Sequence, residues 1–364
     1  MQAAGVDALL VCGNQYTGFE GAVRYVSGFE IVHRYAYVLI PLDAEPTLVF
    51  PREARWIGDK SRPWVREHVW PEIPGQWVRE RTAEKNWKRL AVYGLDAVMA
   101  VRDFRELSAG PCELVKFDFE FDMARAVKSA EEFTHIRESL DIILDGFQAL
   151  LRAYRPGRTE AEIMAPAVER FFARGAGPRM MNIVLSGTGG TAEAHFKVPG
   201  KRVVSADDLL LYSLEIAAEQ GYWVEFSRAL ISGQPHAVTQ KMIAVYPEAL
   251  EAARLQMREG HPASSVHKAA ADVLSRAGFG LGHLSGHSIG VTMIEHPAIG
   301  ANVDVPLREN MVFSFHPQVV DQEGKICLYT QDMYRVGKKE GENLCDVPWK
   351  LYSGAETATV HATR

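Results

Sequence analysis

The chain has 364 residues, a length that predicts about two domains, and its composition (47% hydrophobic, 24% charged) excludes a disordered, coiled-coil or collagen-like protein. The net charge of −6 and the lack of a basic cluster argue against nucleic acid as a main partner. No apolar run approaches the roughly 20 residues of a membrane-spanning helix, and no signal peptide is visible. Four widely spaced cysteines are typical of reduced thiols. We therefore expect a soluble, cytoplasmic protein.

The first third of the chain alternates short apolar runs with helical stretches. Residues 6–11, 34–41 and 47–50 have the length and apolar character of β-strands. This alternation predicts an α/β domain over residues 1–124.

Two capping boxes then mark the start of helices. Ser129 is followed by Glu132, and apolar residues recur behind this pair at spacings of three and four as far as residue 150. Thr159 and Glu162 repeat the same signal for a second helix. We place the start of the second domain, residues 125–364, just before the first of these helices.

The rest of the second domain combines helices with hairpin-like strands. Helices are expected over residues 237–258 and 264–277, and strands over 209–217, 222–232, 289–294, 311–320 and 326–336. Helices grouped around antiparallel strands predict an α+β domain.

Several of these strands carry a polar side chain within an apolar frame. The two-residue period of a strand places Glu225 on one face with Ser227, and Ser314 on one face with His316. Gln331 shares a face with Tyr329 in the same way. Each polar group alone could be hydrogen-bonded or lie on a solvent-exposed face of a sheet. Together, these groups indicate a cleft with a functional site.

Two glycine-rich segments present further histidines. His283 and His287 lie among glycines 282, 286 and 290, which suits a close approach of the backbone to a substrate. Residues 187–192, with an acidic residue at 207, imitate a dinucleotide-binding fingerprint. The chain then runs through His195 to a Pro-Gly pair and cannot form the required helix, so we interpret this segment as a loop that presents His195.

At this point the sequence resembles the pita-bread fold superfamily, the M24-like group that includes creatinase, prolidase and aminopeptidase P. The resemblance rests on residues 286–290, on the hairpin at residues 221–222 followed by Arg228, and on residues 306–312. Residues 4–11 and 25–29 are similar to the smaller domain of the prolidase and creatinase branch. The resemblance thus implies an α/β N-terminal domain followed by an α+β pita-bread domain.

The resemblance also implies where a metal site would lie, because the peptidases of the group bind two metals through Asp, Asp, His, Glu and Glu. The matching positions here are Ser213 or Leu214 (with Glu215 just out of register), Glu225, His287, His316 and Gln331. A dinuclear site needs several anionic oxygens, so this set disfavours Xaa-Pro aminopeptidase activity. It is most similar to the metal-free creatinase-like branch.

The expected function is therefore metal-independent cleavage of a non-peptide C–N bond, of the amidine, urea, lactam or amide type, in a small polar substrate. His195 matches the creatinase histidine that acts as acid and base, and it would move the proton with no cofactor. Glu225, His287 and His316 complete the catalytic set. Substrate-binding residues are expected at Gln331, Arg34, His33 and Glu295. Creatinase-like proteins also imply a homodimer.

Two alternatives remain open. Glu225, His287 and His316 could instead hold one divalent transition metal for a lyase or hydrolase reaction. The fold could also serve as a catalytically silent binding module, although four ionisable residues in one pocket favour chemistry.

Overall fold

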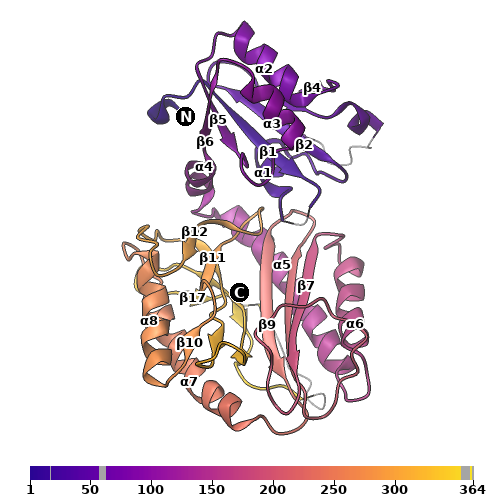
Figure 1. Cartoon of the computed structure of the whole chain (residues 1–364), viewed down its shortest axis with the longest axis vertical. Coiled ribbons are helices and arrows are strands. Elements are labelled where there is room, and N and C mark those ends of the chain that lie inside the picture. Colours follow the sequence, from indigo (N-terminus) through magenta and orange to yellow (C-terminus); the bar gives the residue numbers. More distant parts are fainter. Residues whose placement is uncertain (17, 57–62, 354–360, 363–364) are drawn as a thin grey trace. The chain divides into compact units, whose positions relative to one another are not determined.

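The computed structural model describes residues 1–16, 18–56, 63–353 and 361–362, and the chain forms two compact units (Figure 1). One unit comprises Met1–Ala124 and Val291–Met293, and the other comprises Arg125–Gly290 and Ile294–Arg364. None of the described helices is long and apolar enough to cross a membrane. The four cysteines are all buried and free.

The first unit is built on a six-stranded mixed sheet with the order β4-β3-β2-β1-β5-β6. Its strands are β1 (Ala8–Asn14), β2 (Tyr35–Pro41), β3 (Thr47–Val49), β4 (Glu67–Val69), β5 (Arg89–Tyr93) and β6 (Glu113–Lys116). Its helices are α1 (Gly21–Ser27), α2 (Pro74–Glu84), α3 (Val101–Ser108) and α4 (Asp118–Arg125), with 3-10 turns η1 (Gln2–Ala4) and η2 (Arg52–Trp56).

The central strand β1 is buried on both faces. Leu9 and Val11 belong to one hydrophobic cluster, whereas Leu10 and Cys12 belong to the other. A strand covered on both faces needs apolar residues at consecutive positions. This is why its sequence is a continuous apolar run, and the expected α/β architecture is confirmed.

The second unit begins with two helices that start where the capping boxes predict. Helices α5 (Ala130–Ala153) and α6 (Glu160–Ala173) follow the N-caps Ser129 and Thr159, and each N-cap side chain accepts from the backbone three residues on. Helix α5 packs against a three-stranded antiparallel sheet. That sheet consists of β7 (Met180–Gly187), β8 (Leu209–Ala217) and β9 (Trp223–Leu230).

The remaining elements of this unit form a second layer of helices and antiparallel strands, in which α8 lies beside β10 and β12, and α7 packs against α8 and β15 (Figure 1). The helices are α7 (Ala237–Arg254) and α8 (Ala263–Arg276). The strands form sheets in the orders β12-β11-β13-β16-β17, β10-β14-β15 and β18-β19. Their bounds are β10 (Gly280–Leu281), β11 (Gly286–Ser288), β12 (Glu295–Ile299), β13 (Val312–Phe315), β14 (Val319–Val320), β15 (Cys327–Leu328), β16 (Asp332–Arg335), β17 (Glu342–Asn343), β18 (Cys345–Asp346) and β19 (His361–Ala362).

Three of the expected strands differ from the structure. No strand covers residues 289–294, because β11 ends at Ser288 and residues 291–293 belong to the first unit. The expected strand 311–320 is interrupted between β13 and β14, where Pro317 has no N–H to donate. The expected strand 326–336 is likewise split into β15 and β16. Both interruptions lie beside residues of the candidate site.

A buried ion pair links the two layers of the second unit next to these interruptions. Arg228 of β9 donates to both oxygens of Asp332 in β16, at 3.1 and 2.8 Å, and both side chains are buried. The backbone N–H of Ser227 donates to the carbonyl of Gln331 at 3.2 Å. The pair therefore fixes β9 against the start of β16.

Candidate metal centre

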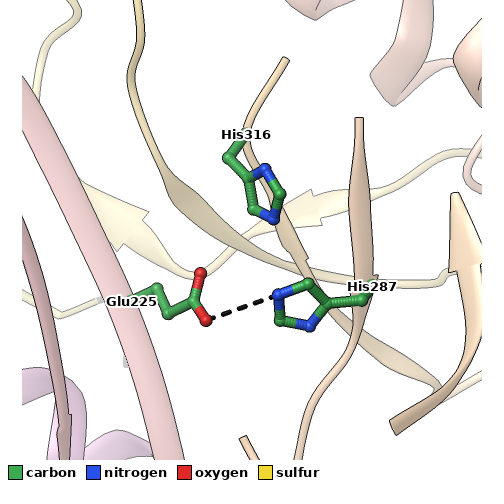
Figure 2. A group of neighbouring side chains, drawn as sticks. All are labelled: Glu225, His287 and His316. Atoms are coloured by element: carbon green, nitrogen blue, oxygen red, sulfur yellow. Dashed lines mark ion pairs between the residues drawn. The ribbon is translucent and has the colours of Figure 1, made fainter. Parts of the chain in front are cut away.

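Three side chains that are far apart in the sequence converge in the second unit. Glu225 comes from β9, His287 from β11, and His316 from the residue that follows β13 (Figure 2). Strands β11 and β13 are antiparallel neighbours, with His287 opposite Ser314. The backbone N–H of His316 donates to the Ser285 carbonyl at 2.7 Å, which holds this residue beside the start of β11.

The ligand atoms of these three side chains form a compact group. One carboxylate oxygen of Glu225 and one ring nitrogen of each histidine all lie within 4.8 Å of one another. The dashed line in Figure 2 marks the 3.5 Å contact between Glu225 Oε1 and His287 Nε2. Glu225 is buried, and the His287 side chain is 12% exposed.

Burial keeps both imidazoles neutral near pH 7. Desolvation lowers the pKa of His287, and desolvation with the nearby His287 and His283 rings lowers the pKa of His316 well below its ordinary value. The Nδ1–H of His287 donates to the Ser288 carbonyl at 3.1 Å, which leaves Nε2 free as a lone-pair donor. Nδ1 of His316 is buried without a hydrogen-bond partner among the described residues.

The Glu225 carboxylate is held by two neutral donors. Ser314 Oγ donates to Glu225 Oε2 at 2.5 Å, and Gln331 Nε2 donates to the same oxygen at 2.9 Å. The second oxygen, Oε1, is the one that faces His287. Desolvation nevertheless raises the pKa of Glu225, because the donors do not fully replace water.

Glu215 is a further member of the site, although the sequence places it just out of register with the metal-binding position of the family. Strands β8 and β9 pair with Glu215 directly opposite Glu225, so both carboxyl groups lie on the same face. Ser213 Oγ contacts Glu215 Oε1 at 2.7 Å, and it also contacts Gln331 Oε1. The sequence contains the residue, but only the hairpin register shows where it points.

The hydrogen-bond geometry indicates that Glu215 carries a proton. The Ser213 hydroxyl has one hydrogen but lies against two acceptor oxygens, those of Glu215 and Gln331. A protonated Glu215 that donates to Ser213 satisfies both contacts, since Ser213 can then donate to Gln331. Burial and the neighbouring Glu225 raise the pKa of Glu215, in agreement with this assignment.

Neither His195 nor Glu295 belongs to this group of three converging ligands. His195 is exposed on the loop after β7, and among the described residues no hydrogen bond or ion pair joins it to Glu225, His287 or His316. No helix begins at the glycines of that loop. Glu295 is buried, and its two oxygens contact the buried cations Arg125 and Lys128 at 3.1 and 3.0 Å. This arrangement favours a structural ion pair over substrate binding for Glu295.

His33 and Arg34 lie in the first unit, and both are exposed. Arg34 has a φ of 67° and an ion pair with Glu53 at 3.5 Å, in which both side chains are about half exposed. Their expected contact with a substrate stays a prediction. Gln331, in contrast, lies within the site, where it bonds to both carboxyl groups.

The residues present fit one divalent transition-metal ion. Two neutral imidazoles and one carboxylate are a ligand set that catalytic zinc sites use, and one position remains open for water or substrate. The contact from His287 Nδ1–H to a backbone carbonyl is the outer contact that orients a metal-binding histidine.

A family model described as metallopeptidase family M24 matches residues 134–338, more than half of the chain. The Xaa-Pro dipeptidase of Lactobacillus delbrueckii subsp. lactis is 26% identical over 325 residues, which cover 84% of this chain and 85% of the relative. The prolidase of Thermococcus sibiricus has a similar structure, with a TM-score of 0.81, 21% identity and coverage of 97% and 95%. Dipeptidase PepE of Mycobacterium ulcerans gives a TM-score of 0.79 at 24% identity, with the same coverage.

These findings correct the expected chemistry. The prediction of metal-independent cleavage of a non-peptide C–N bond was wrong, and so was the prediction that the protein has no cofactor. The matching family is a metallopeptidase family, and the relatives are dipeptidases. The creatinase-like assignment and the argument against Xaa-Pro peptidase activity fall for the same reason. The alternative with a metal at Glu225, His287 and His316 agrees better with the structure. The expected superfamily and fold are confirmed, and the chain belongs to metallopeptidase family M24.

Proposed function

We propose that the protein is a metal-dependent peptidase that hydrolyses small peptides of the Xaa-Pro type, with the metal held by Glu225, His287 and His316. The observation that carries the proposal is the convergence of these three ligand atoms within 4.8 Å. The names of the relatives supply the substrate class to test first, since two of the curated relatives are Xaa-Pro dipeptidases from Lactobacillus.

A divalent ion in such a site supplies a Lewis acid and lowers the pKa of water, which is what peptide hydrolysis requires at neutral pH. The two imidazoles bind as neutral ligands because burial has already removed their protons. Ser314 and Gln331 fix one oxygen of Glu225, so the other oxygen keeps its direction towards His287. Glu215 holds a proton beside this group, and a departing amine needs a proton donor of this kind.

The test is the release of free proline from Ala-Pro, Leu-Pro and Met-Pro by protein without a histidine tag, loaded in turn with Mn²⁺, Co²⁺, Fe²⁺ and Zn²⁺. We expect turnover with at least one metal and a loss of more than about 100-fold in His287→Ala, since even outer partners of metal ligands are worth about 10–100-fold. The matched control is His236→Asn, because His236 is an exposed helix N-cap and asparagine also caps well.

Two results would overturn the proposal. One is the failure of every metal form to release proline, and the other is full activity in His287→Ala. The expected homodimer, the small-molecule character of the substrate and the cytoplasmic location stay predictions. Light scattering on the purified protein measures the first of them directly.

A further inference from the structure

Two buried carboxyl groups face each other beside the proposed metal ligands, and a glutamine lies between them. Glu215 and Glu225 are directly opposite in the β8–β9 pair, and both are at most 3% exposed. Gln331 Nε2 donates to Glu225 Oε2 at 2.9 Å and to Glu215 Oε1 at 3.3 Å. One amide nitrogen therefore bonds to both carboxyl groups.

Neighbouring carboxyl groups in a buried site need a proton, a donor or a cation between them. Here the structure contains a donor. The Gln331 amide donates to both carboxyl groups, so neither Glu215 Oε1 nor Glu225 Oε2 is left without a hydrogen-bond donor.

The position of the Gln331 amide is fixed from several sides. The backbone carbonyl of Gln331 accepts from Ser227 N–H at 3.2 Å and from Arg228 Nη1 at 3.3 Å. Its side-chain oxygen contacts Ser213 Oγ. With the side chain 1% exposed, this amide cannot rotate away without leaving buried donors unpaired.

We propose that Gln331 takes the place of a second cation and limits this site to a single metal ion. The inference rests on the proposed function for the identity of the first ion, which Glu225, His287 and His316 hold. The new element is Gln331, which lies beside Oε2 of Glu225, the oxygen that does not face His287. There an amide that donates hydrogen bonds stands where a carboxylate would complete a cluster of hard anionic oxygens, the kind of site that divalent cations prefer.

The experiment measures bound metal rather than activity. Wild-type protein, Gln331→Glu and the double variant Gln331→Glu/Glu215→Gln are equilibrated with Mn²⁺, dialysed and analysed by elemental mass spectrometry. We expect one equivalent in wild type and two in Gln331→Glu. The double variant is the matched control, because it contains the new carboxylate but restores the original number of carboxyl groups, and we expect it to return to one equivalent.

Electron paramagnetic resonance of the Mn²⁺-loaded protein gives a second readout that does not depend on the variants. An isolated ion gives a six-line spectrum, whereas two ions that share a carboxylate give an exchange-coupled signal. We expect the isolated form in wild type, and this measurement decides the question even if Gln331→Glu does not fold.

The outcomes separate this inference from the proposed function. Two equivalents or a coupled spectrum in wild type would overturn the role of Gln331 and leave peptide hydrolysis intact. A folded Gln331→Glu that still binds one ion would also overturn it. One ion without any release of proline would overturn only the proposed function, and wild type that binds no metal would overturn both.

Discussion

The buried pair of Arg228 and Asp332 offers a sharp test of how the site is held together. Arg228 donates to both oxygens of Asp332, at 3.1 and 2.8 Å, and also to the carbonyls of Ser227 and Val347 at 2.9 and 2.8 Å. Both charged side chains are at most 4% exposed. Asp332→Asn leaves the guanidinium buried without a counter-charge, a change that costs about 3–5 kcal/mol in comparable pairs.

The free energy of unfolding is measured by urea denaturation of the metal-free protein, so that bound metal does not add its own stabilisation. Glu340→Gln serves as the matched control. It removes one carboxylate from the ion pair between Arg254 and Glu340, in which Glu340 is half exposed, and such pairs contribute about 0–1 kcal/mol.

A second comparison separates the loss of charge balance from simple loss of packing. Arg228→Met/Asp332→Leu removes both charges, and buried pairs replaced in this way are often neutral in stability. We expect the double variant to be more stable than Asp332→Asn alone. A loss in Asp332→Asn no larger than that in Glu340→Gln, or a double variant that is less stable than the single one, would refute the reasoning.

Three further predictions concern the metal, pH and helix packing. Chelation should lower the melting temperature, and added metal should restore it. At a free metal concentration of 1,000 Kd the bound ion should add about 4 kcal/mol to the free energy of unfolding, whereas His287→Ala should respond to neither treatment. Since the pKa of Glu215 lies above its ordinary value of 4.5, the folded state keeps a proton that the unfolded state loses, so the contribution of Glu215 to the stability of the metal-free protein should fall as the pH rises above that value. Thermal scans should show Glu215→Gln more stable than wild type at pH 8, with a smaller difference at pH 5. Gly146→Ala should cost about 1–3 kcal/mol in urea unfolding, because a Cβ there would lie 2.1 Å from the Phe171 ring, and Phe171→Leu should reduce that cost.

Local signals in the sequence predicted the helices well. The capping boxes at Ser129 and Thr159 concern groups three residues apart, and both form the expected pair of hydrogen bonds. The strand faces were also readable, since Ser314 and Glu225 do point towards each other. These features depend on residues that are close together in the sequence, so the sequence alone is enough to predict them.

The breaks in the strands could not be predicted from the sequence, because they depend on tertiary contacts. Apolar residues run on both sides of His316, and the sequence predicts one strand there. In the structure the chain leaves β13 at this residue, and the Pro317 carbonyl accepts from Tyr246 Oη at 2.8 Å. The break places His316 at the end of its strand, facing the other ligands. Departures from local pattern are expected at functional sites.

The direction of the Glu215 side chain could not be predicted from the sequence, for a related reason. A shift of one residue in a hairpin sends every side chain to the opposite face, and a strand that is buried on both faces gives no alternation from which to read the register. All nine residues of β8 are buried, so its sequence does not show which face Glu215 takes.

The expectation of a metal-free site failed because it counted anionic oxygens without considering the protonation state of the whole group. Replacing carboxylates by His316 and Gln331 removes negative charge, but burial also makes both histidines neutral ligands. Two neutral imidazoles and Glu225 balance one divalent ion to a net charge of +1, which a bound hydroxide or the substrate can neutralise. A second ion at the same carboxylate would leave +3 in a buried site, where uncompensated charge is costly. The loss of carboxylates therefore argues against two metal ions rather than against metal.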